Sequence, residues 1–219
     1  MNTESITTGR IQGTSVNTVL RNTYWLLSLT LAFAALTAGI SMALNLPHPG
    51  LLLTLAGYLG LLLLTSHYRN SAVGLVCVFA LTGFMGYTLG PILNAYIGMS
   101  DGAQIVMTAF AGTGVIFLGL SGYALTTRRD FSFLGGMLFV GILVAFLAGL
   151  AALFFDMPSL SLAVSAMFVL LMSGLILYET QQIARGGETN YIMATVTLFV
   201  SIFNLFTSLL HLLGFASQE

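Results

Sequence analysis

The sequence predicts an all-α polytopic membrane protein with seven transmembrane helices. Of its 219 residues, 57 % are hydrophobic and only 6 % are charged, whereas a soluble domain carries about 25 % charged residues. The apolar segments run for about twenty residues, the length that a helix needs to cross a hydrocarbon layer about 30 Å thick. Strands of a membrane β-barrel would alternate apolar and polar residues, so a barrel is excluded.

The elements follow in a simple order. Residues 1–22 are polar, lack the apolar core of a signal peptide, and predict a flexible cytoplasmic N-terminal tail. Residues 23–219 predict a transmembrane domain whose helices are separated by short connections rich in proline and glycine. The expected spans are residues 24–44, 50–67, 72–97, 103–125, 131–155, 159–182 and 191–214.

Small residues inside the spans predict close helix contacts. Gly86 and Gly90 are four residues apart, and Gly141, Ala145 and Gly149 form a second series with the same spacing. Such faces let helix backbones approach closely in lipid. The Gly90–Pro91 pair predicts a kink or a break in the third span, which serves either packing or a hinge.

All positive charges fall on one side of the membrane if the seven helices alternate in direction. There are no lysines, and the six arginines lie in the N-terminal segment and in the second, fourth and sixth connections: Arg10, Arg21, Arg69, Arg128, Arg129 and Arg185. By the positive-inside rule, the N-terminus is cytoplasmic and the C-terminus faces outward.

Glu179 is the one acid well within a predicted span. An acid at mid-membrane costs about 2.5 to 3.5 kcal/mol on insertion scales, and it usually faces protein or water. One interpretation is a carboxylate that reaches the cytoplasmic surface near Arg185. The other is a desolvated group that acts as a protonation switch.

The seventh span carries a polar stripe. Its members are spaced by four, three, four and three residues and so share one helix face; they are Thr197, Ser201, Asn204, Ser208 and His211. They either bond their own helix and a neighbour or line a hydrated path from His211 toward Glu179. Ser201 is expected about 10 Å deeper than Glu179 if the sixth helix ends at Gln182. The two can then meet only through a bridging water, or if that helix continues through Arg185.

No enzyme chemistry is visible in the sequence. It contains no Ser-His-Asp set, phosphate-binding loop or metal-ligand spacing, and Cys77 is its single cysteine. A net charge of -1 gives no basis for binding nucleic acid. We therefore expect no catalytic activity, cofactor or resident metal.

The C-terminal stretch "LYETQQIARGGETNYIMATVTLFVSIFNLFTSLLHLLG" resembles the Bax inhibitor-1 (transmembrane Bax-inhibitor-motif) family. Further similarity runs through "VLRNTYWLLSLTLAF", "GYTLGPILNAY" and "TTRRDFSFLGGML". The resemblance implies seven helices with the seventh surrounded by the others. Its bacterial inner-membrane branch implies a modulator of the ATP-dependent membrane protease FtsH, with HflK and HflC as further candidate partners.

The same resemblance implies an alternative function, a pH-sensitive leak for calcium ions or protons. In family members of this type, an acid in each of the last two spans forms a pair. Glu179 matches the first acid, but Ser201 occupies the second position. A lone acid cannot share a proton with an absent partner, so this departure argues against a two-carboxylate switch.

Overall fold

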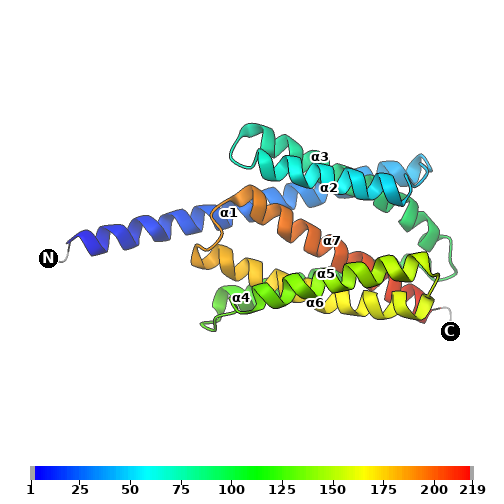
Figure 1. Cartoon of the computed structure of the whole chain (residues 1–219). Coiled ribbons are helices and arrows are strands. Elements are labelled where there is room, and N and C mark those ends of the chain that lie inside the picture. The colour runs from blue at the N-terminus through cyan, green and yellow to red at the C-terminus, as the bar shows by residue number, and fades with distance from the viewer. Residues whose placement is uncertain (1–2, 218–219) are drawn as a thin grey trace. The chain divides into compact units, whose positions relative to one another are not determined.

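The computed structural model describes residues 3–217, and it describes side chains from residue 16 onward. All regular structure in this range is helical, as predicted, and the helices are joined by short connections (Figure 1). Their bounds are α1 Thr3–Ala43, α2 Leu51–His67, α3 Ala72–Ile97, α4 Gly102–Thr126, α5 Leu134–Phe154, α6 Pro158–Arg185 and α7 Tyr191–Ala216.

Six of the described helices are long and apolar enough to cross a membrane, and α2, with 17 residues, is a shorter apolar helix. Apart from the start of the first helix, the predicted bounds differ most at two helices. The fifth helix begins at Leu134 rather than at residue 131, and α6 continues to Arg185 rather than ending at residue 182. The extension ends at Gly186, whose φ of 77° is a left-handed conformation that glycine adopts without a steric penalty.

The predicted N-terminal tail has helical backbone from Thr3, so α1 has 41 residues and only its segment Val16–Ala43 qualifies as a candidate span. The flexibility of the tail stays a prediction. The chain divides into two compact units, residues 3–95 with 182–199 and residues 96–181 with 200–217. Helix α7 contributes its first part to the first unit and the rest to the second.

In the first unit, α3 packs closely on α1 through its glycines. A Cβ atom on Gly86 would collide with the Thr37 side chain and the Ala34 backbone, and one on Gly90 would lie 2.5 Å from Ser41 Cβ. These glycines are therefore required for the close approach of the two helices. The predicted packing role of the Gly86 and Gly90 pair is confirmed.

Pro91 does not break α3, so the alternative of a break at Gly90–Pro91 is wrong. A proline in a helix deprives the carbonyl four residues earlier of its hydrogen bond, and here that carbonyl belongs to Tyr87. The Ser41 hydroxyl of α1 donates to it at 3.0 Å. Because a neighbouring helix supplies the missing donor, α3 continues through Pro91 to Ile97.

In the second unit, α5 and α6 pack through the other predicted series of small residues. Ala145 is fully buried. A Cβ on Gly141 would lie 2.7 Å from Leu171 Cδ2, and one on Gly149 would lie 3.5 Å from Val164 Cγ1. Gly141 and Gly149 thus lie at the contact with α6, which agrees with the predicted close packing of this series; the sequence did not identify the partner helix.

Helix α7 is the most buried of the six candidate spans. In its most apolar window, 44 % of the residues are buried, against 17 to 39 % in the other five. This burial agrees with the expectation that polar residues of the seventh span face protein. Its central place among the other six helices stays a prediction.

Candidate functional site

Glu179 lies in a cluster of buried polar residues on α6. Its exposed fraction is 8 %, and the next two residues, Thr180 and Gln181, are 0 % and 3 % exposed. Successive residues of a helix project about 100° apart. Three consecutive buried residues therefore mean that α6 is covered over more than half of its circumference here.

The depth of Glu179 differs from the sequence-based expectation. Because α6 continues to Arg185, Glu179 lies about 9 Å along the axis from the helix end. The sequence placed it about one turn from the end. The sequence analysis required a sixth helix that extends through Arg185 for Glu179 and Ser201 to approach each other. Helix α6 meets this condition.

The polar stripe of α7 has two kinds of member. Ser201 and Ser208 are buried, with exposed fractions of 0 % and 8 %, whereas Thr197, Asn204 and His211 are half-buried. The Asn204 amide donates to the Val200 carbonyl of its own helix at 2.8 Å. Asn204 thus bonds within α7, where the sequence suggested a bond to a neighbouring helix. A path along the stripe stays a prediction.

His211 is held by α6. Its Nδ1 lies 2.8 Å from the Ser165 hydroxyl, which in turn lies 3.0 Å from the Ser161 carbonyl. A carbonyl can only accept, so Ser165 donates its one proton to Ser161 and accepts from His211. This assigns the neutral imidazole proton to Nδ1 and leaves Nε2 as an acceptor.

Gln181 connects the end of α6 to the α4–α5 connection, residues 127–133. Its Oε1 accepts from the Phe131 N–H at 2.7 Å, and its Nε2 donates to the Arg129 carbonyl at 2.7 Å. The amide thus binds the backbone on both sides of Asp130, whose Oδ1 accepts from the Ser132 N–H and hydroxyl. These four bonds join residues 129–132 to side chains of α6 and of the connection itself.

Asn190 makes the corresponding contact in the first unit. Its Nδ2 donates to the Arg69 carbonyl at 3.0 Å and to Asn70 Oδ1 at 2.8 Å, in the connection between α2 and α3. Its Oδ1 accepts from the Met193 N–H at 3.0 Å and so caps α7. Each unit thus has a side-chain amide that donates a hydrogen bond to the backbone carbonyl of an arginine: Asn190 to Arg69, and Gln181 to Arg129.

Sequence reasoning missed Ser165 and the role of Gln181. Gln181 follows Glu179 and Thr180 directly, and three adjacent polar residues in an apolar helix were the available signal. Their partners lie 46 to 52 residues away in sequence, so spacing along the chain could not reveal the pairs. In the described part of the chain, no three His, Cys, Asp or Glu side chains gather in a way that could hold a metal ion.

Comparison with known proteins identifies the family. The family model described as inhibitor of apoptosis-promoting Bax1 matches residues 16–218. The chain belongs to the Bax inhibitor-1 family. It is 55 % identical over 205 residues to the "Modulator of FtsH protease YccA" of Escherichia coli strain K12, which covers 94 % of this chain and 93 % of the relative.

Two further relatives agree with this assignment. The "Inner membrane protein YccA" of an Escherichia coli O6:H1 strain is also 55 % identical over 205 residues, covering 94 % of this chain and 93 % of the relative. An uncharacterized protein of Pseudomonas aeruginosa is 56 % identical over 204 residues, covering 93 % and 92 %. Together with the six apolar helices, these similarities identify a multi-pass membrane protein of the Bax inhibitor-1 family.

Proposed function

We propose that this protein is a bacterial inner-membrane protein that binds the FtsH protease and modulates its action in membrane-protein quality control. The observation that carries the proposal is the 55 % identity, across 94 % of the chain, to a protein named as a modulator of FtsH. The chain is expected to act as a regulatory partner and to have no enzymatic activity of its own. HflK and HflC are further candidate partners.

The polar N-terminal segment and the packing of α1 suggest a physical route. A protease that pulls its substrate from an end can grip a polar segment of about twenty residues outside the membrane. Extraction from this end must then separate α1 from α3, where Gly86 and Gly90 bring the two helices close together. A chain that offers an accessible end but resists extraction would occupy FtsH and spare other substrates.

The tail hypothesis is tested by deleting residues 3–17 and, as a matched control, by replacing them with a scrambled segment of the same composition. We expect the deletion to preserve folding, to slow degradation of the chain by FtsH and to reduce its protection of other substrates. The scrambled segment should behave as the original. Unchanged turnover together with unchanged protection after the deletion would refute a role for the tail.

The proposed topology has seven spans, a cytoplasmic N-terminus and a periplasmic C-terminus. Helix α2 would be the seventh span: its 17 residues rise about 26 Å, near the lower limit for crossing the hydrocarbon layer. We expect His48→Cys and Ser71→Cys, which flank α2, to react with an impermeant maleimide from opposite sides of the membrane in a Cys77→Ala background. Labelling from the same side would mean that α2 does not cross.

A second candidate function is a pH-sensitive leak for calcium ions or protons. The observation that favours it is the burial of Glu179, with an exposed fraction of 8 %, in a membrane-embedded helix. The proposed path comprises Glu179 and the stripe residues Thr197, Ser201, Asn204, Ser208 and His211. The test is calcium and proton flux in liposomes at acidic and neutral pH, beside Glu179→Gln. Flux equal to that of empty liposomes would exclude the leak.

A further inference from the structure

The C-terminal end of α1 is bound by α3 on both sides of Pro91. Before the proline, the Tyr87 carbonyl accepts from the Ser41 hydroxyl at 3.0 Å. After the proline, Asn94 Nδ2 donates to the Met42 carbonyl at 3.1 Å. Two consecutive residues of α1 are thus bonded to residues of α3 that lie on either side of the proline.

The connection that follows α1 is bound by the same two residues of α3. Asn45 comes just after α1 with a left-handed φ of 48°, and its Oδ1 lies 3.3 Å from Asn94 Nδ2. The Tyr87 hydroxyl donates to the Pro47 carbonyl at 2.8 Å. Together these are four hydrogen bonds between α3 and residues 41–47. We call the residues that make them the α1 latch: Ser41, Met42, Asn45, Pro47, Tyr87 and Asn94.

The latch includes a point of close contact between two candidate spans. Ser41 is 1 % exposed, and a Cβ on Gly90 would lie 2.5 Å from Ser41 Cβ and 3.0 Å from the Ala38 carbonyl oxygen. The Ser41 hydroxyl is therefore shielded from water. When its bond to Tyr87 breaks, water cannot readily replace the lost partner, and an unsatisfied polar group in an apolar environment is costly. Separating α1 from α3 here costs more than separating apolar side chains alone.

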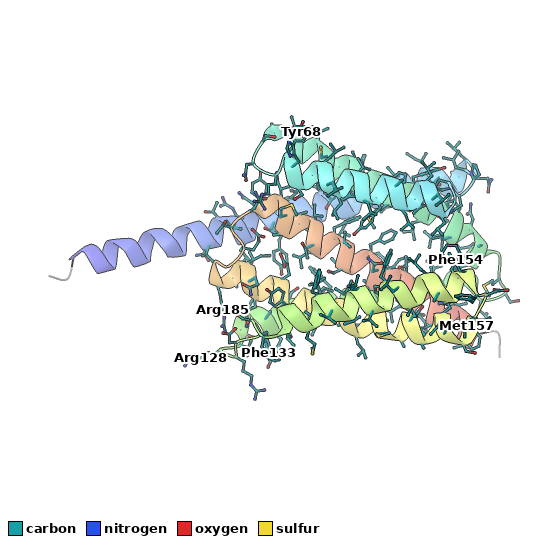
Figure 2. All side chains as sticks on the ribbon, in the orientation of Figure 1. Tyr68, Arg128, Phe133, Phe154, Met157 and Arg185 are labelled. Carbon is teal, nitrogen blue, oxygen red and sulfur yellow. The ribbon has the colours of Figure 1, made fainter. Side chains whose placement is uncertain are left out.

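The latch lies at the end of α1 that is farthest from the N-terminus. Figure 2 shows Tyr68 at the end of the first unit from which the N-terminal part of α1 extends, and α1 runs from there toward the opposite end of the unit. Unravelling from the N-terminus first reaches the Thr23 carbonyl, which accepts from the Thr195 hydroxyl of α7 at 3.3 Å. It reaches Ser41 and Met42 only at the last turn of α1.

We propose that the α1 latch sets how long the chain resists extraction from its N-terminus. The inference rests on the proposed function, in which FtsH pulls on the N-terminal segment. While the latch holds, the residues before Ser41 are released and the rest of the chain stays in the bilayer. The protease then remains occupied without removing the protein. The lifetime of the latch under load determines how long other substrates are spared.

The test is single-molecule force spectroscopy of the full chain in a lipid bilayer, pulled from the N-terminus at constant force. Forty released residues have a contour length of about 130 to 145 Å, and we expect a pause at this length. Loss of one hydrogen bond changes a rate by about fivefold. Ser41→Ala should therefore shorten the pause about fivefold. Asn94→Asp should shorten it by at least as much, because an ionised carboxylate cannot donate to the Met42 carbonyl.

The matched control is Ser28→Ala, which removes an exposed hydroxyl of α1 that donates to the Tyr24 carbonyl of its own helix at 2.8 Å. It should change the pause by less than twofold. The pause of Asn94→Asp should lengthen as the pH falls, because a protonated carboxyl group can donate again. The proposal is overturned if no pause occurs at this length, or if Ser41→Ala and Asn94→Asp leave the pause unchanged, or if Ser28→Ala shortens it equally.

Degradation by purified FtsH in proteoliposomes separates the latch from the proposed function. The double variant Ser41→Ala/Asn94→Asp should be degraded faster than the parent and should protect a second substrate less. All variants are compared at a temperature where circular dichroism shows the helix content of the parent. Unchanged pauses would overturn the latch whatever the protease does. Shorter pauses with unchanged degradation would support the latch as a barrier to pulling and would refute extraction by FtsH from this end.

Discussion

The Gln181 contact predicts a measurable loss of stability when its two hydrogen bonds are removed. Gln181→Met keeps the size of the side chain but leaves the Phe131 N–H and the Arg129 carbonyl without their 2.7 Å partners. An unsatisfied buried group costs about 1 to 3 kcal/mol. Arg129 is exposed and Phe131 half-buried, so water replaces part of the loss. The expected decrease in unfolding free energy is about 2 to 3 kcal/mol.

Two assays report this loss. Thermal unfolding in detergent, followed by circular dichroism, should show a midpoint lower by about 4 to 12 °C, at about 2 to 4 °C for each kcal/mol in a chain of this size. Trypsin cleavage after Arg128 or Arg129 should be faster by about 30- to 160-fold, because 2 to 3 kcal/mol raises the population of the open connection by about this factor. Trypsin cleavage at these sites reports the opening of the α4–α5 connection alone, whereas thermal unfolding reports the whole chain.

The matched control is Gln104→Met, which changes an exposed glutamine on α4 and should alter stability by less than about 0.5 kcal/mol. Gln181→Glu adds a test of bond direction, because an ionised carboxylate cannot donate to the Arg129 carbonyl whereas a protonated one can. This variant should be destabilised at neutral pH and should recover as the pH falls. Trypsin cleavage of Gln181→Met at the parental rate would refute the assigned contact.

Three further predictions concern the packing of α1, each measured by thermal unfolding. Gly86→Ala should lower the unfolding free energy by about 1 to 3 kcal/mol through overpacking. The control is Gly39→Ala, where an added Cβ meets nothing within 4 Å and stability should be unchanged or higher. Equal effects of the two substitutions would contradict the close contact at Gly86. Ser41→Ala should cost about 1 to 2 kcal/mol by leaving the Tyr87 carbonyl without its donor, and an unchanged midpoint would contradict that role. The Thr23 hydroxyl is buried without a partner among the described residues, so Thr23→Val should stabilise by about 1 kcal/mol; a lower midpoint would argue against it.

Much of the fold could be predicted from the sequence because a lipid environment requires long, continuous apolar helices. The helix bounds followed from hydrophobic length, and the close packing at Gly86 and along Gly141, Ala145 and Gly149 followed from small residues at helical spacing. The break at Pro91 was wrong because the sequence does not show that Ser41, fifty residues earlier, supplies a donor to the freed carbonyl.

The candidate site was less predictable from sequence. The polar stripe of α7 and the unusual position of Glu179 were visible as polar residues in apolar spans. The contacts of Gln181, Asn190 and His211 depend on connections and helices that meet only after folding. Helix α6 ends at Arg185 because Gly186 adopts a left-handed backbone conformation. The Gly186–Gly187 pair in the sequence indicates that a helix can end there, but it does not show at which residue.

The most direct test of the proposed function is the rate at which purified FtsH degrades a second membrane substrate in proteoliposomes containing this protein. Three forms are compared: the full chain, the chain without residues 3–17, and Glu179→Gln. The proposal predicts that the full chain and Glu179→Gln slow degradation of the second substrate in proportion to their amount, and that the deletion largely abolishes this effect. An unchanged degradation rate at a molar excess of the full chain would contradict modulation of FtsH.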